Sequence, residues 1–287
     1  MNRKSLPVTL CFVLSWIFTL AQSPDFKQKI ASRSAESFER YDLFASEETN
    51  ARQRSQLANT LSQVQILSLK KDALASLRSQ AEPAISVELS YAGTLLELAL
   101  VRANPVAPAF KVVTASGLRI RPDKNLYYWG TVKGQENSLA AINIYDGQIS
   151  GLIAVDGHIY NLVREENAES YFLFREEDLL ITNPFDCFTD EDLHWLKQED
   201  QNQRASNADN CINMYVEVDY DIVQGKGGAQ AAADYVMAAF NQVAILYANE
   251  GINFQISEMK VWDVPDPYNF SSTSDYLYAF RDALGGN

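Results

Sequence analysis

The segment between Cys211 and Leu284 constrains the fold most, because its pattern predicts a strand, a long helix, a second strand and a second helix. Apolar residues at every second position predict a strand from Ile212 to Val218. Phe254–Trp262 predicts the second strand. Between them Ala231–Asn249 carries apolar residues at helical spacing, namely Val236, Ala239, Phe240, Val243, Leu246 and Tyr247. Two strands joined by a long helix are expected to pair in parallel through a right-handed crossover, which opens an α/β domain.

Turn residues mark the boundaries of these elements. The Gly225-Lys226-Gly227-Gly228 run comes before the long helix and lacks the spacing and the Ser/Thr of a phosphate loop, so it is interpreted as a turn. Gly251 is expected to end the long helix. Asp263–Pro267 predicts a rigid turn before the second helix, which is expected around Leu277 and Phe280.

This segment resembles the first half of the catalytic domain of a reprolysin-like (adamalysin-type) zinc metalloprotease, which is a metzincin. The stretches that carry the resemblance occur in the family's order and are Tyr215–Asp219, Phe240–Val243, Tyr247–Ile252, Val261-Trp262, Asp266-Pro267-Tyr268 and the helix around Leu277 and Phe280. The resemblance implies that residues 211–287 are the N-terminal half of such a domain. The expected structure is its first βαβα unit, truncated before the central part.

A second region, from Ala84 to Thr182, has the period-2 pattern of short strands with frequent turn signals. Asp146-Gly147 and Asp156-Gly157 lie between apolar runs, and Asp-Gly in that position predicts a two-residue hairpin turn. Residues 84–183 are therefore expected to form an antiparallel β meander.

The β region has its own resemblance, to the propeptide of the same metalloprotease family. The residues that carry it are Tyr128–Gly134, Asn137–Ile142, Gly151-Leu152-Ile153 and Tyr160. In the family this propeptide precedes the protease domain, as it would here. The resemblance implies that residues 22–204 are a propeptide.

Residues 22–80 are polar, with apolar residues about one helical turn apart, such as Phe38 and Tyr41 or Leu57 and Leu61. This spacing predicts amphipathic helices that pack on another element. The expected fold class is therefore α+β. N-terminal helices and a β-rich, antiparallel propeptide would precede the first βαβα of a metzincin α/β catalytic domain.

The first residues, 1–21, have the features of a secretory signal peptide. Arg3 and Lys4 are positively charged, Leu6–Leu20 is apolar, and Ala21 follows as a small residue suited to the cleavage site. The apolar run is too short for a comfortable membrane span. The predicted location is secreted, either extracellular or at the cell surface, with no transmembrane segment after signal cleavage. An uncleaved N-terminal anchor is the alternative.

Charge and composition narrow the class of partner. The 287 residues carry a net charge of −13 at pH 7, whereas a nucleic-acid binder needs a basic face, so no nucleic-acid partner is expected. The hydrophobic share of 47% is sufficient to bury a core. The partners that the resemblance implies are polypeptide substrates and, within the precursor, the propeptide held against its own catalytic domain.

Residues 197–210 contain almost no apolar side chains and are interpreted as an exposed linker. Proteolysis concentrates in such segments. Arg204 is a candidate processing point between propeptide and enzyme. An ordinary surface loop is the competing interpretation.

A zinc protease of this family needs the motif His-Glu-x-x-His and a third His, so that two imidazoles lie on one side of the metal with Glu beside the bound water. The two histidines of this chain are His158 and His194, and neither has an adjacent Glu or a His four residues later. The zinc ligands are thus expected beyond Asn287, and the 287 residues are not expected to cleave peptides. The implied function is that of a secreted zinc-dependent metalloendopeptidase precursor, a zymogen. The alternative is a non-catalytic secreted binding or adhesion protein with a protease-like fold.

Two cysteines, Cys187 and Cys211, lie outside the predicted signal peptide. In latent metzincins a propeptide thiolate can occupy the open zinc position, and the resemblance makes Cys187 a candidate for such a cysteine switch. A Cys187–Cys211 disulfide in an oxidising compartment is equally compatible with the sequence.

Two carboxylates, Glu217 and Asp266, match positions that contribute to a structural calcium site in reprolysin-like enzymes. Calcium takes 6–8 oxygen ligands, so other segments would have to supply the rest. A solvated Glu and a turn-forming Asp are the alternative, because lone carboxylates usually face water.

Overall fold

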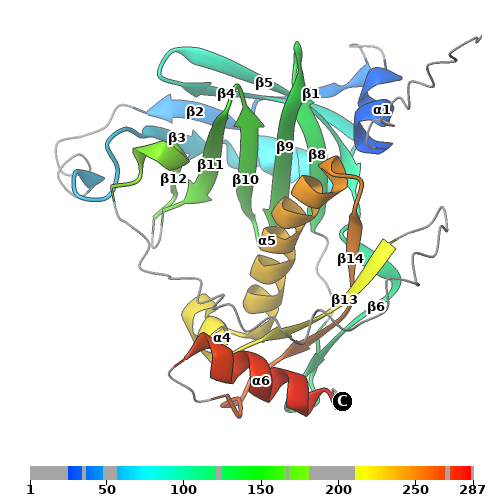
Figure 1. Cartoon of the computed structure of the whole chain (residues 1–287). Coiled ribbons are helices and arrows are strands. Elements are labelled where there is room, and N and C mark those ends of the chain that lie inside the picture. Colours follow the sequence, from blue (N-terminus) through cyan, green and yellow to red (C-terminus); the bar gives the residue numbers. More distant parts are fainter. Residues whose placement is uncertain are drawn as a thin grey trace, which may run out of the picture.

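Two sheets with one long helix between them organise the chain, which forms a mixed α+β fold (Figure 1). The computed structural model describes residues 25–33, 37–47, 57–120, 125–165, 168–180, 211–268 and 272–285. In spatial order the large sheet contains β1 (Glu39–Tyr41), β4 (Ala84–Tyr91), β5 (Thr94–Ala103), β8 (Leu126–Val132), β9 (Gln135–Tyr145), β10 (Gln148–Val155), β11 (His158–Arg164), β12 (Ser170–Arg175), β3 (Gln65–Leu69) and β2 (Phe44–Glu47). The small sheet contains β13 (Cys211–Val218), β14 (Asn253–Val261), β6 (Val106–Thr114) and β7 (Arg119–Ile120).

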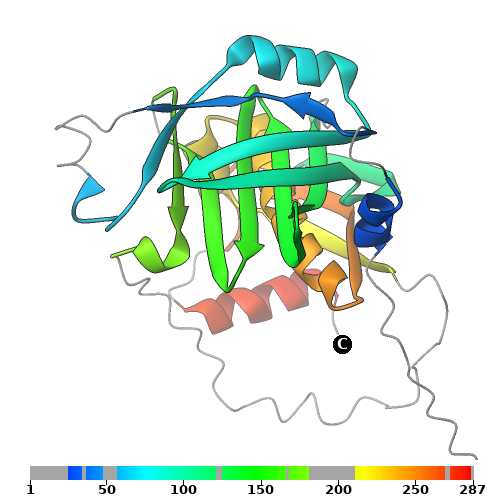
Figure 2. The same ribbon diagram turned by 90° about the horizontal axis from the view of Figure 1, so that it is seen from above.

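The large sheet curls back on itself because its two edge strands, β1 and β2, are consecutive in the chain. The stretch Glu39–Glu47 pairs with β4 in its first half and with β3 in its second half. Leu43, at the corner between the two halves, is fully buried. The curled sheet surrounds an apolar core, to which α3 (Lys71–Gln80) adds Leu74 and Leu77. Figure 2 shows β1 and β2 in blue beside α3 in cyan along one side of this sheet.

The predicted hairpins are confirmed. Asp146 and Gly147 have φ of 45° and 66°, and Asp156 and Gly157 have φ of 52° and 79°. Positive φ at both central residues is the geometry of the two-residue turn that matches strand twist. A third turn of this form, at Ala92-Gly93 between β4 and β5, carried no Asp-Gly signal.

Of the named elements described within residues 22–80, α1 (Asp25–Ala31) and α3 agree with the helical prediction. Between these helices the structure has β1, β2 and β3, so Tyr41 lies on a strand. The physical reason is that pairing with β4 and with β12 satisfies the backbone of these strands at long range. Such tertiary pairing overrides weak local helical spacing.

The predicted strand–helix–strand unit is confirmed, since β13 and β14 pair in parallel. A short helix, α4 (Tyr220–Lys226), includes Gly225 and Lys226 of the stretch expected as a turn. The break between α4 and the long helix lies at Gly227 and Gly228, which both have positive φ. The long helix α5 spans Ala229–Asn249, and α6 spans Thr273–Ala283. A 3-10 turn, η2 (Glu176–Asp178), follows β12.

One strand of residues 84–183, β6, is not part of the expected antiparallel meander and belongs to the small sheet. β6 pairs in parallel with β14, on the side of β14 opposite β13. The short strand β7 then pairs antiparallel with β6 at the edge. The small sheet is therefore built from both of the regions that the sequence pattern separates.

The predicted apolar face of α5 is buried only in part, because Val236 and Phe240 are half-buried against the small-sheet core and the later residues of the face are exposed. Val243, Leu246 and Tyr247 are 46%, 39% and 43% exposed. The buried side chains of α5 are mostly small and are Ala232, Ala233, Asp234, Met237, Ala238, Asn241, Ala244, Ile245 and Ala248. The reason is that α5 lies between two sheets, and small side chains allow close approach on both sides.

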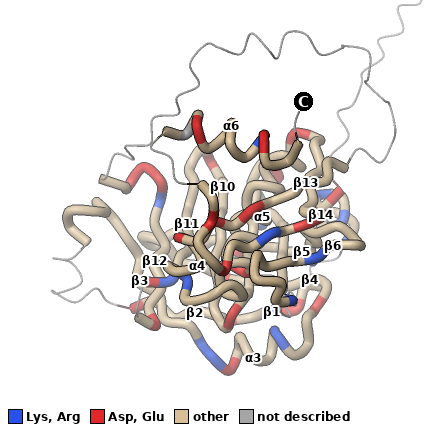
Figure 3. Tube along the Cα trace, turned by 90° about the horizontal axis from the view of Figure 1, so that it is seen from below, with Lys and Arg blue, Asp and Glu red and all other residues tan. Residues whose placement is uncertain are grey.

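Charges are spread along the chain. Figure 3 shows Lys and Arg positions interspersed with Asp and Glu positions in the view from below, including both signs on α6. Most ion pairs join exposed side chains, as between Lys111 and Glu258 or Lys133 and Glu97. Exposed pairs of this kind contribute little to stability.

Gly130 in β8 generates the first prediction, because a Cβ at this position would lie 2.0 Å from the backbone oxygen of Ala99 and 2.8 Å from Leu100 Cδ2. We expect Gly130→Ala to lower the free energy of unfolding by about 3 kcal/mol, measured by urea denaturation. Gly225→Ala is the control, since nothing lies within 4 Å of its Cβ position and Ala favours the α4 helix. Equal stability of Gly130→Ala and the wild type would contradict this packing.

Candidate functional site

The carboxyl edge of the small sheet is the first candidate site. β13, β14 and β6 run parallel, so their C-terminal ends meet at one edge. In open α/β sheets ligands bind at this edge. The polar side chains in and after these strand ends are Ser116, Glu217, Asp219, Asp263 and Asp266.

Glu217 has a buried side chain, of which 8% is exposed. Its Oε1 accepts a hydrogen bond from the Tyr215 hydroxyl at 2.7 Å. Its Oε2 accepts from Trp262 Nε1 at 2.7 Å and from the Tyr268 hydroxyl at 3.1 Å. Lys260 Nζ lies 3.7 Å from Oε1 and supplies the opposite charge. The buried charge is thus fully satisfied by the protein, as buried charges must be.

Glu217 changes the acidity of the phenols around it. Burial, followed by the charge of Glu217, raises the pKa of Tyr268 to about 12. Burial and the hydrogen bond to Glu217 also raise the pKa of Tyr215. Both phenols therefore stay protonated and donate to the carboxylate over the whole physiological range.

The other carboxylates of this edge are engaged by the backbone. Asp266 accepts from the amides of Tyr220 at 3.0 Å and Tyr268 at 2.9 Å. Asp219 is the N-cap of α4 and accepts from the Ile222 amide at 2.9 Å. Such side chains end strands and begin helices, which is a structural role.

Asp263 ties β14 to the turn after β6. It accepts from the Ser116 amide at 2.9 Å and from the Ser116 hydroxyl. Burial alone would raise the pKa of Asp263, but the hydrogen bonds from Ser116 outweigh it and lower that pKa.

The structure brings Glu217 and Asp266 together, since the hydroxyl of Tyr268 donates to one and its amide to the other. Their oxygens already accept hydrogen bonds, and in the described part of the chain no three His, Cys, Asp or Glu residues are placed to hold a metal. The calcium role of these two residues stays a prediction. The zinc-site residues of the family are not present in the sequence, so no zinc chemistry can be derived from this chain.

The remaining predicted site residues have different outcomes. Cys211 begins β13, is half-buried, and has a thiol pKa raised by burial. Cys187, Arg204 and Ala21 lie outside the described residues, as does His194. The cysteine switch, the disulfide and both processing points therefore stay predictions.

Aromatic side chains cover the polar edge and connect it to α6. Tyr215 stacks on Phe280 with ring centroids 6.4 Å apart, and Trp262 meets Tyr268 edge-on at 6.1 Å. The Nζ of Lys260 lies 3.8 Å from the centroid of the Trp262 ring. The sequence could have predicted one contact of this arrangement. Tyr215 and Glu217 are two residues apart on a strand, so their side chains lie on the same face.

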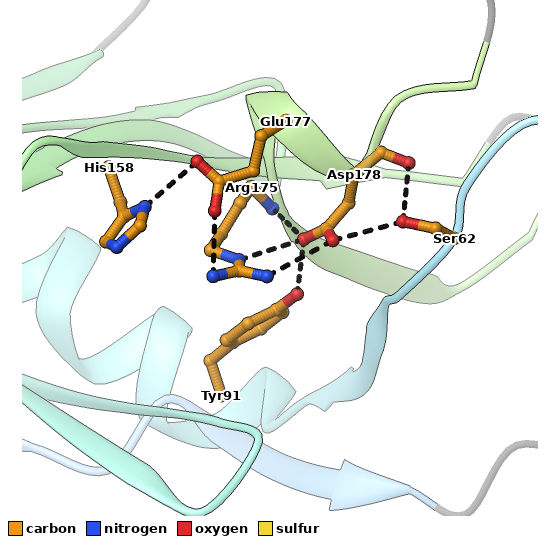
Figure 4. A network of polar contacts seen from close by, with 6 residues as sticks. All are labelled: Ser62, Tyr91, His158, Arg175, Glu177 and Asp178. Atoms are coloured by element: carbon orange, nitrogen blue, oxygen red, sulfur yellow. Dashed lines mark hydrogen bonds and ion pairs between the residues drawn. The ribbon is translucent and has the colours of Figure 1, made fainter.

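A second polar cluster lies in the large-sheet region, where β12 is followed directly by η2 (Figure 4). Its centre is Asp178, whose side chain is 6% exposed. Oδ2 accepts from the Tyr91 hydroxyl at 2.5 Å and from Arg175 Nε at 3.1 Å, and Oδ1 accepts from the Ser62 hydroxyl at 3.1 Å. Burial alone would raise the pKa of Asp178, but the hydrogen bonds from Arg175, Tyr91 and Ser62 outweigh it and lower that pKa.

The cluster extends through Glu177 to His158. Arg175 contacts Glu177 at 2.8 Å, and His158 Nδ1 lies 2.9 Å from Glu177 Oε2. Ser62 donates to Asp178 and His158 is engaged by Glu177, so they do not form a nucleophile–base pair (Figure 4). The arrangement fixes η2 to the bend at Ser62, which precedes β3. No local pattern could have predicted it, because Ser62 and Asp178 are 116 residues apart.

No protein-family model matches the chain, and no curated protein matches it. Among the described helices, none is both long and apolar enough to cross a membrane.

Glu217 generates the second prediction. We expect Glu217→Gln to lower the free energy of unfolding by about 1–3 kcal/mol, because an amide NH₂ would face a donor and Lys260 would lose its partner. Glu258→Gln is the matched control on the adjacent strand, where the side chain is 35% exposed and pairs with exposed Lys111. Its effect should stay within about 0.5 kcal/mol in the same denaturation assay. Equal losses in the two variants would contradict the structural role of Glu217.

Asp178 generates a pH-dependent prediction. Its pKa in the folded state lies below the unfolded value of about 3.9, so its contribution to stability is present above that pH and is lost as pH falls through the folded pKa. We expect Asp178→Asn to lose about 2 kcal/mol at pH 7 and to show a weaker acid dependence than the wild type. Glu176→Gln, an exposed position in the same turn, should keep the wild-type profile. Parallel pH profiles for wild type and Asp178→Asn would contradict this role.

Proposed function

We propose that the chain is the N-terminal part of a secreted zinc metalloendopeptidase precursor. In this proposal a signal peptide and a propeptide precede the first half of a reprolysin-like catalytic domain. Residues 25–180 would belong to the propeptide and residues 211–285 to the catalytic domain. The observation that carries the proposal is an α/β unit whose sheet edge and helix face are not covered by any of the described residues.

The uncovered edge belongs to β13. Among the described strands β13 pairs only with β14, so no described strand pairs with its other edge. Exposed edges of this kind are normally paired or protected. A further strand added here would extend the α/β sheet in the direction that a larger catalytic domain requires.

Next to this edge lies an apolar patch, which we define as Ile212, Met214, Val243, Leu246 and Tyr247. Their side chains are between 37% and 46% exposed. Strand alternation puts Ile212 and Met214 on the same sheet face as Val216 and Val218, which pack near α5. The patch continues across Phe254, which lies opposite Ile212 and contacts the Tyr247 ring at 4.5 Å.

A free edge with an adjoining apolar patch is the surface that one more strand and helix would cover. Contiguous exposed apolar surface of this kind marks an interaction site in soluble proteins. The resemblance supplies the candidate, because the metzincin domain continues with further elements and a helix that carries His-Glu-x-x-His. That helix would bring the zinc, whose bound water attacks the peptide bond.

The contacts between the two regions also support the proposal. The outer face of the large sheet packs on α5, which belongs to the proposed catalytic half, through a cluster that contains Val101, Leu139, Ala141 and Ile245. A propeptide that folds together with its enzyme requires such an apolar contact. The resemblance places the two parts in the same order.

A second function is favoured by a different observation. Every carboxylate described at the carboxyl edge accepts hydrogen bonds from the protein. This edge therefore has the character of a structural frame, as expected for a non-catalytic secreted binding or adhesion protein. The apolar patch would then be its partner surface.

The reading frame beyond codon 287 distinguishes the two functions. We expect it to encode His-Glu-x-x-His within about 100 residues. The purified longer precursor, once processed, should hydrolyse a casein substrate, and changing the Glu of the motif to Gln should lower kcat by on the order of 10²–10⁴. The 287-residue chain should have no such activity. A stop codon after codon 287, or a continuation without the motif, would contradict the protease and favour the binding protein.

A further inference from the structure

The two regions on either side of residues 181–210 are interlocked through α5. Figure 1 shows this helix between the large sheet and the small sheet. Its residues Ala233, Met237 and Ala238 pack in a core with Val218 and Met259 of the small sheet. Its Ile245 packs in a different core on the outer face of the large sheet. The helix therefore depends on the N-terminal region to bury one of its sides.

β6 also connects the N-terminal region to the small sheet, because it pairs with β14. The Ile256 amide donates to the Pro105 oxygen and the Ala115 amide donates to the Val261 oxygen, both at 2.9 Å. Val112 of β6 is 5% exposed and packs in the small-sheet core. A strand from residues 84–180 is thus part of the sheet that residues 211–268 form.

Buried polar contacts make this interface specific. Asn241 Nδ2 donates to Asn143 Oδ1 at 2.7 Å, and both side chains are fully buried. Trp129 Nε1 donates to the backbone carbonyl oxygen of Asn241 at 3.2 Å. Asn125 Nδ2 donates to Asp234 Oδ1 at 2.7 Å. Separation would leave these buried groups without their partners and would expose the apolar side of α5.

We infer that residues 25–180 and residues 211–285 remain bound to each other after the chain between them is cut. The N-terminal region is then a ligand of the C-terminal region, and β6 is the strand that retains it. A cut at Arg204, or elsewhere in residues 197–210, would remove one covalent link and leave the strand pairing and the α5 interface in place. The inference rests on the described contacts and holds whether the protein is a protease precursor or a binding protein.

The experiment uses the full chain with a recognition sequence for a site-specific protease inserted after Gln203. The folded chain is purified, cut to completion, and passed through a size-exclusion column in native buffer. We expect one peak of the uncut size that contains both fragments on a denaturing gel. Two separate peaks of the individual fragments, with no shared peak, would overturn the inference.

Two neighbouring residues of β6 test the role of the strand. Val112 is buried in the small-sheet core, whereas Val113 is 40% exposed. Val112→Asp should release the N-terminal fragment after the cut, and Val113→Asp should not. If uncut Val112→Asp shows a lost circular-dichroism signal, Val112→Ala replaces it and should release the fragment about tenfold faster than the wild type. Identical release rates for the Val112 and Val113 variants would overturn the role of β6.

Discussion

The packing of α5 between two sheets is the constraint on which the rest of the structure depends. A helix in this position must bury most of its circumference, and bulky side chains on every side would hold the sheets apart. The chain meets this requirement with alanines at most buried positions of α5. Where a polar side chain is buried, as at Asn241, it pairs with Asn143 of the large sheet. Close approach and hydrogen bonding are thus achieved at the same interface.

This packing determines which surfaces are left open. Because the small side chains of α5 face the sheets, its bulky residues Val243, Leu246 and Tyr247 lie on the outside, where Tyr247 contacts Phe254 of β14. The same geometry requires β6 to complete the small sheet on the other side of β14. The exposed apolar patch and the position of β6 in the small sheet therefore both follow from the packing of α5.

Glu217 and Asp178 are carboxylates with buried side chains, and the protein compensates their charge in the same way. Each is surrounded by phenol, hydroxyl or indole donors and by one basic side chain, Lys260 or Arg175. In a chain with a net charge of −13, burying an acidic group without such partners would be strongly unfavourable. Both clusters therefore stabilise the segments that they join, and in the second cluster Ser62 donates to Asp178 while His158 contacts Glu177.

The sequence by itself determined those elements that a short stretch of residues specifies, namely two hairpin turns and one strand–helix–strand unit. The Asp-Gly turns require positive φ, and the β13–α5–β14 unit has its own periodicity. Only the tertiary structure decided that residues 39–47 are strands, that β6 joins the small sheet and that α5 buries its alanine side. It also decided that Asp178 meets Ser62. The reason is that periodicity reports the conformation of a segment, whereas the partner of an edge or a face depends on which distant groups can satisfy it.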